Sequence, residues 1–158
     1  MVFGNIVVAF DGSSHAKAAV KKAVDISQLE PESQITVVVI SSNHNAQLAE
    51  SLNMSGFDPE QFQLSTEDIL AIHDKAIEEE TAKLDKAVAS IIAPVKDRVA
   101  LKIVPGNNPS VQIVESARKL GADVIVMGSR GLGAVRGMLG SVSFAVLRES
   151  EIPVLVVK

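Results

Sequence analysis

Five short runs of β-branched and other apolar residues recur along this chain of 158 residues. The runs are Ile6–Phe10, Ile35–Ile40, Val99–Val104, Val124–Met127 and Val154–Val157. Several are apolar without alternation, which is typical of strands covered on both faces in a parallel sheet. Turn residues bound each run, and helical patterns separate most of them. The sequence therefore predicts five strands in an α/β fold.

The expected helices carry capping residues at their ends. Ser13 or Ser14 is placed to cap the helix after the first strand. After the third strand, Asn108 as N-cap and Pro109 at the first helical position predict a helix start, and Gly121 predicts its end. In the same way, Ser141 is expected to cap the helix between the last two strands.

The longest helix is expected between the second and third strands. It should begin near Ser65, which forms a capping-box-like pair with Asp68, and end before Pro94. The run Glu78-Glu79-Glu80 is interpreted as its solvated side. Its expected buried face consists of Leu70, Ile77, Leu84, Val88 and Ile91.

This alternation predicts a three-layer sandwich with a five-stranded parallel sheet, strand order 3-2-1-4-5, and helices on both faces. The strand order reverses between the first and fourth strands, which opens a crevice at their carboxyl ends. Functional residues are therefore expected directly after Phe10 and after Met127.

Residues 1–158 are expected to form one domain, because a chain of this length buries enough surface for a single core. The segment Ser41–Leu64 is longer than a compact connection requires. We expect it to be a lid, to contain a short helix over Ala46–Leu52, or to be partly disordered. A variable surface insertion is the alternative.

Charge and composition exclude several classes of function. The 15 Lys and Arg residues are outnumbered by 19 Asp and Glu, so a nucleic-acid partner is not expected. No apolar run approaches the roughly 20 residues that span a bilayer, so we expect a soluble, cytoplasmic protein and no membrane partner. The chain has no cysteine, and its three histidines fit no ligand spacing, so no metal site made by side chains is expected.

A glycine-rich loop follows the fourth strand. Five of the ten glycines lie between Gly128 and Gly140, directly before a predicted helix. The backbone N–H groups of such a loop and the positive end of the helix dipole form a cradle for phosphates. Arg130 and Arg136 are the only charged residues in the loop, and their charge suits an anion. The alternative is a flexible connection whose glycines only permit tight turns.

The loop resembles the G-x-x-G-x(9)-G-[ST] loop of ATP-binding universal stress proteins, with Gly128, Gly131, Gly140 and Ser141 at the matching positions. Between Gly131 and Gly140 this chain has eight residues where the family pattern has nine. Further stretches similar to the family are Ile6–Ser13, Val104–Pro109, Gly121–Gly128 and Pro153–Val157.

The resemblance implies ATP, ADP or AMP as the ligand, with Mg²⁺ or Mn²⁺ held mainly through the phosphates. It assigns ribose or adenine to Asp11, the nucleoside wall to Ala9 and Ile40, and the border of the base to Met127. The groups implied to hold the phosphates are the N–H groups of Gly128, Gly131, Gly140 and Val142, the hydroxyl of Ser141 and the side chain of Arg130. From the sequence alone, Asp11 also suits a turn or helix-cap carboxylate.

The resemblance further implies a nucleotide-dependent switch or stress-response factor that forms a homodimer through the edge strand 154–157. No catalytic residue is expected, because no Ser-His-Asp or paired-carboxylate arrangement follows from the spacing, and any ATP hydrolysis should be slow. Three alternatives stay open. They are a dimeric binding module of the same fold without ATP, a slow ATP-hydrolysing enzyme, and a flavodoxin-like electron carrier.

Overall fold

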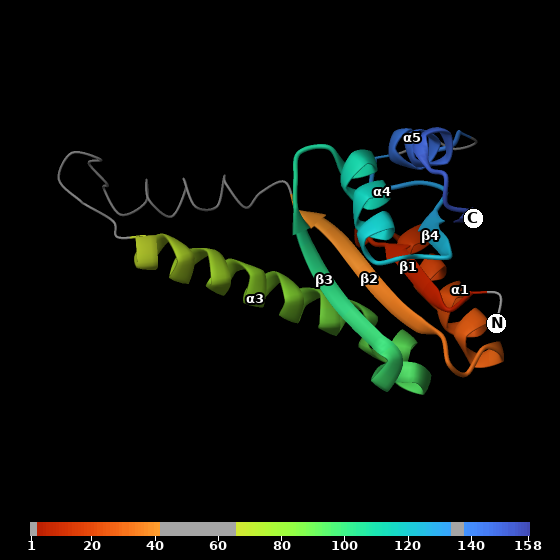
Figure 1. Cartoon of the computed structure of the whole chain (residues 1–158), viewed down its shortest axis with the longest axis horizontal. Helices are drawn as coiled ribbons and strands as arrows, with labels where there is room; N and C mark the ends of the chain where they lie inside the picture. Colours follow the sequence, from red (N-terminus) through yellow and green to blue (C-terminus); the bar gives the residue numbers. More distant parts are fainter. Residues whose placement is uncertain (1–2, 42–65, 134–137) are drawn as a thin grey trace.

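A computed structural model describes residues 3–41, 66–133 and 138–158 of the chain (Figure 1). The strands in these ranges are β1 (Asn5–Ala9), β2 (Gln34–Ser41), β3 (Val99–Pro105), β4 (Val124–Gly128) and β5 (Val154–Val157). The helices are α1 (Ser14–Leu29), α3 (Thr66–Ile92), the 3-10 helix η1 (Ala93–Arg98), α4 (Pro109–Lys119) and α5 (Ser141–Glu149).

The strands form one parallel sheet in the order β3-β2-β1-β4-β5, which confirms the predicted topology. At the centre of the sheet, Val8 of β1 is paired with Val37 of β2 on one side and with Val126 of β4 on the other. The bounds of every strand lie within one residue of those predicted. The apolar runs predicted these strands well because both faces of the sheet are covered.

The two faces of the sheet are covered by different helices. On one face, α1 and α3 bury a core that includes Val8 and Val20. On the other face, α4 and α5 bury a second core that includes Val7 and Ile125. The successive residues Val7 and Val8 therefore enter opposite cores, as expected for a strand inside three layers. No helix in the described part of the chain is both long and apolar enough to cross a membrane.

Most of the predicted helix-end residues are confirmed. Ser13 caps α1, and its Oγ accepts a hydrogen bond from the N–H of Ala16 at 3.1 Å. Asn108 caps α4, and Gly121 follows that helix with a φ of 61°. The prediction that Ser141 caps α5 is wrong, because the N-cap is Gly140 and Ser141 is the first helical residue.

The predicted course of α3 is confirmed at its end but not along its whole buried face. The helix stops at Ile92, two residues before Pro94. Leu84 and Val88 are buried, and Ile77 and Ile91 pack against the same core. Leu70 was expected on this face but is 55% exposed. The first turns of α3 project beyond the edge of the sheet, so none of the described strands covers Leu70 there (Figure 1).

The predicted capping residue Ser65 lies outside the described residues, as does almost all of the segment Ser41–Leu64 with its expected lid or helix over Ala46–Leu52.

Candidate functional site

A cavity of about 990 Å³ opens at the carboxyl ends of β1, β2 and β4, where the strand order reverses. Parallel α/β sheets bind ligands at this position. The ten residues singled out from the sequence all line it, and they are Ala9, Asp11, Ile40, Met127, Gly128, Arg130, Gly131, Gly140, Ser141 and Val142. The fold therefore brings together groups from four separate elements and the loops between them.

Asp11 joins the turn after β1 to the glycine loop. Its Oδ1 accepts a hydrogen bond from the N–H of Ser13 at 2.9 Å, so Asp11 does serve as a turn carboxylate. The hydroxyl of Ser13 in turn donates to the carbonyl of Arg130 at 3.3 Å. Asp11 Oδ2 lies close to Gly131, since a Cβ atom added there would stand 2.7 Å from it. The exposed carboxyl is thus held in place at the edge of the cavity.

Two hydrogen bonds hold the ends of the glycine loop together. The hydroxyl of Ser143 on α5 donates to the carbonyl of Gly128 at 2.8 Å. The N–H of Gly140 donates to the carbonyl of Ser129, also at 2.8 Å. In this conformation the N–H of Gly140 is thus already paired inside the loop, and its role toward a phosphate stays a prediction.

The start of α5 supplies the free donors instead. Gly140, as N-cap, has no side chain to accept from the first turn. Within the described residues, no group accepts from the N–H groups of Ser141, Val142 and Ser143. A helix start with unpaired N–H groups carries partial positive charge and binds anions. Arg130 lines the same cavity, whereas Arg136 lies outside the described residues.

The cavity also has an apolar wall at the strand ends. Ala9 and Met127 are almost fully buried, and Ile40 is half-buried at the end of β2. Ile113 of α4 lines the cavity on the same face of the sheet. Such a wall provides a surface against which a flat apolar group can pack.

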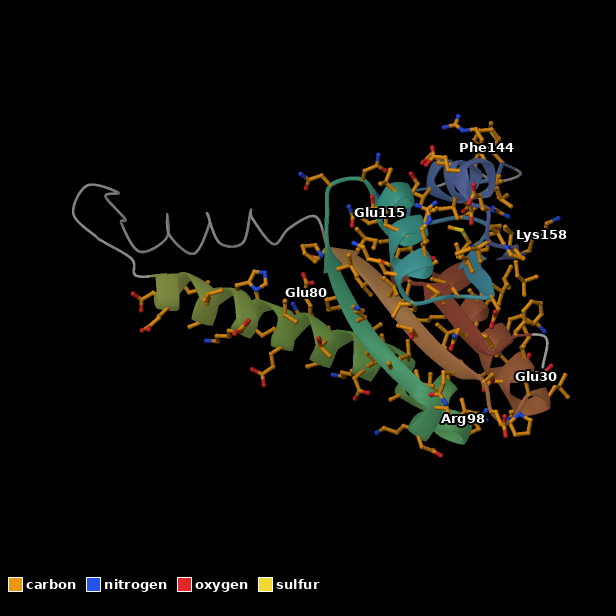
Figure 2. The ribbon with its side chains drawn as sticks, in the orientation of Figure 1. Glu30, Glu80, Arg98, Glu115, Phe144 and Lys158 are labelled. Atoms are coloured by element: carbon orange, nitrogen blue, oxygen red, sulfur yellow. The ribbon has the colours of Figure 1, made fainter. Side chains whose placement is uncertain are left out.

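Helix α3 contributes residues that the sequence interpretation missed. Glu80 was assigned to the solvated side of the helix, but it is half-buried and lines the cavity, whereas Glu78 and Glu79 are exposed. Its Oε1 accepts a hydrogen bond from Ser41 Oγ at 2.9 Å. Figure 2 shows Glu80 on the side of α3 that faces the sheet. Its spacing in the sequence could have predicted this position. Glu80 comes three residues after Ile77 and four before Leu84, so it lies on the same face of the helix as these two residues.

No group of three or more His, Asp or Glu side chains placed to hold a metal ion occurs in the ranges that the structure describes.

The model of the universal stress protein family matches residues 3–158. The chain belongs to the universal stress protein family. This universal stress protein is 33% identical to one from Thermus aquaticus, described as the universal stress protein in QAH/OAS sulfhydrylase 3'region, over 99% of this chain and all of the relative. The resemblance stated from the glycine loop and the strand ends is thereby confirmed.

Solved structures share the fold of this universal stress protein. The structure of hypothetical protein MJ0577 superposes with a TM-score of 0.71 at 26% identity, covering 100% of this chain and 97% of the other. A universal stress protein from Archaeoglobus fulgidus in complex with dAMP gives a TM-score of 0.62 at 24% identity, with both chains fully covered. A universal stress protein in complex with cAMP gives a TM-score of 0.62 at 23% identity, covering 99% of this chain and 98% of the other.

Proposed function

We propose that this universal stress protein binds an adenine nucleotide, ATP in particular, in the cavity at the carboxyl end of its sheet. The observation that carries the proposal is the lining of the cavity, which combines unpaired N–H groups at the start of α5 with an apolar wall and a fixed carboxyl. The complexes of related structures with dAMP and cAMP add support, because both ligands are adenine nucleotides.

The proposed orientation follows from the polarity of the lining. The phosphates lie at the start of α5 and beside Arg130, where the donors and the positive charge are concentrated. The ribose lies next to Asp11, whose Oδ2 can accept from a sugar hydroxyl. The base packs between Ala9 and Ile40, with Met127 at its border.

A divalent cation is part of the proposed ATP complex. Mg²⁺ usually keeps several waters and is bound through substrate phosphates with one or two carboxylates. We expect Mg²⁺ or Mn²⁺ to be held mainly by phosphate oxygens in the same way.

We further propose that the bound nucleotide acts as a switch rather than as a substrate for fast turnover. The glycine loop is closed by contacts between its two ends, and the Ser13–Arg130 hydrogen bond ties it to the turn after β1. A ligand that contacts both segments stabilises one arrangement of them, and so changes the surface offered to a partner.

The proposed assembly is a homodimer through β5. This strand lies at the edge of the sheet. Together β5 and α5 expose Phe144, Leu147 and Leu155, of which Phe144 is labelled on α5 in Figure 2. Edge strands with exposed apolar side chains pair readily with another chain. A two-fold axis beside β5 would pair the strand with its own copy and cover these residues.

Calorimetric titration of the full-length protein with MgATP tests the proposal. We expect saturable binding of one nucleotide per chain, weakened in Asp11→Ala. Analysis of the nucleotide after prolonged incubation distinguishes a switch from a slow ATP-hydrolysing enzyme. Unchanged ATP supports the switch, and steady release of pyrophosphate or phosphate supports a slow enzyme. A folded protein that binds no nucleotide would leave the binding module without ATP as the function.

A further inference from the structure

Helix α3 contributes to the cavity a carboxyl oxygen that the contacts proposed above leave unused. The hydrogen bond from Ser41 Oγ to Glu80 Oε1 holds this side chain at the end of β2 (Figure 2). Glu80 Oε2 is buried and has no hydrogen-bond partner within the described residues. Buried polar atoms are nearly always paired, because an unpaired one loses its hydration without compensation. An unpaired acceptor on a cavity wall therefore points to a donor on the ligand.

The neighbouring Lys83 does not supply that donor. It lines the cavity one turn further along α3, but its side chain is exposed. Among the residues that the structure describes, no ion pair joins Lys83 to Glu80. Glu80 Oε2 thus stays available to a molecule inside the cavity.

The order of the strands places Glu80 at the far end of the cavity from the glycine loop. Gly128 ends β4, Asp11 follows β1, and Ser41 ends β2. These strands are neighbours in the order β2-β1-β4, and neighbouring strands lie about 4.8 Å apart. A nucleotide with its phosphates after β4 and its ribose after β1 therefore extends its base toward the end of β2, where Glu80 stands.

We propose that Glu80 is a specificity-determining residue whose Oε2 accepts a hydrogen bond from the 6-amino group of the purine. The inference rests on the proposed nucleotide function and deepens it. Adenine presents an N–H donor at position 6, which suits an unpaired carboxyl oxygen. Hypoxanthine and guanine present a carbonyl oxygen at the same position, which would face Glu80 Oε2 with lone pair against lone pair. Glu80 thus selects 6-amino over 6-oxo purines.

Titration of the full-length protein with MgATP and with MgITP, in wild type, Glu80→Gln and Glu80→Leu, tests this role. Wild type should bind ATP about tenfold to a hundredfold more tightly than ITP, the range expected for one hydrogen bond to a charged group. Glu80→Gln keeps an oxygen for Ser41 and turns an N–H donor toward the base, so the ratio should fall about tenfold or more. Glu80→Leu should lose affinity for ATP but not for ITP, whose carbonyl oxygen then no longer faces a carboxyl oxygen.

The outcomes separate this role from others. A Glu80 that only fastens α3 to β2 predicts a lower melting temperature in Glu80→Leu and the same ATP-to-ITP ratio in all three proteins, and that result overturns the proposal. A wild type that binds ATP and ITP equally overturns it as well, while leaving the nucleotide site intact. If no folded variant binds either nucleotide, the proposed function itself fails.

Discussion

The carboxyl group of Asp11 stands against the backbone of Gly131, so closely that a Cβ atom added at Gly131 would lie 2.7 Å from Asp11 Oδ2. The other oxygen of this carboxyl accepts from the N–H of Ser13. A side chain at position 131 would therefore need space that the Asp11 carboxyl now occupies. This contact couples the glycine loop to the group proposed to bind the ribose.

Gly131→Ala should weaken nucleotide binding. The new methyl group must displace the Asp11 carboxyl, and losing one charged hydrogen bond to the ligand costs about 1.5 kcal/mol, or roughly tenfold in affinity. Because the obstacle is the end of an exposed side chain, the free energy of unfolding should hardly change. Gly133→Ala is the matched control, since a Cβ atom there meets nothing within 4 Å. Equal affinities for MgATP in both variants would contradict the coupling.

Gly128→Ala should destabilise the fold itself. A Cβ atom at Gly128 would lie 2.7 Å from His15 Cβ and 2.9 Å from the backbone nitrogen of Ala16, where α1 packs against β4. A backbone that cannot yield makes such overpacking cost about 1–3 kcal/mol. Urea unfolding measures the loss. In the control Gly106→Ala, the three atoms nearest to the added Cβ all belong to the flexible side chain of Gln112, which can move away. A loss of stability in this control as large as that of Gly128→Ala would argue against the close approach of α1.

Arg98 should stabilise the end of α1. Its Nη1 lies within 3.4 Å of four carbonyl oxygens in the last turn of α1 and the connection to β2. The carbonyls belong to Ser27, Glu30, Pro31 and Ser33. Arg98→Met should therefore lower the free energy of unfolding by about 1.5–3 kcal/mol, the usual value of hydrogen bonds from a charged donor. The control is Lys96→Met, at an exposed lysine on the same 3-10 helix, which should change the free energy of unfolding much less.

Leu155→Glu should convert the proposed dimer to a monomer. Leu155 is exposed on the edge strand β5, and a two-fold axis would bring the two introduced carboxylates near each other. Sedimentation at micromolar concentration should show a dimer for wild type and a monomer for the variant. Leu29→Glu, at a more exposed leucine at the end of α1, should remain dimeric. A wild type that sediments only as a monomer would contradict the assembly.

Much of the fold could be predicted because the central strands β1, β2 and β4 are largely buried on both faces. A fully covered strand such as β4 is apolar throughout, so its run of apolar residues is enough to predict it. The caps Ser13 and Asn108 were also predictable, since their side chains satisfy N–H groups only a few residues away. Short stretches of sequence therefore sufficed to predict the strands and two of the helix starts.

The errors arise where a local pattern depends on distant structure. Helical spacing places Leu70 and Glu80 on the same side of α3, but it does not show where the sheet ends. The first turns of α3, which include Leu70, extend beyond that edge, whereas the hydrogen bond from Ser41 holds Glu80 at the cavity. The glycine pattern predicts a role for Gly140, but it does not show that the loop returns to Ser129. In the structure the carbonyl of Ser129 accepts from the N–H of Gly140.

The most direct test of the account follows the backbone N–H signals of the protein by NMR during titration with MgATP. The proposed contacts predict that the largest shifts occur at Ser141, Val142 and Ser143, whose N–H groups begin α5, and at Gly131 beside Asp11. If saturating MgATP leaves these signals unmoved while the protein stays folded, the start of α5 does not bind the phosphates and the central claim is wrong.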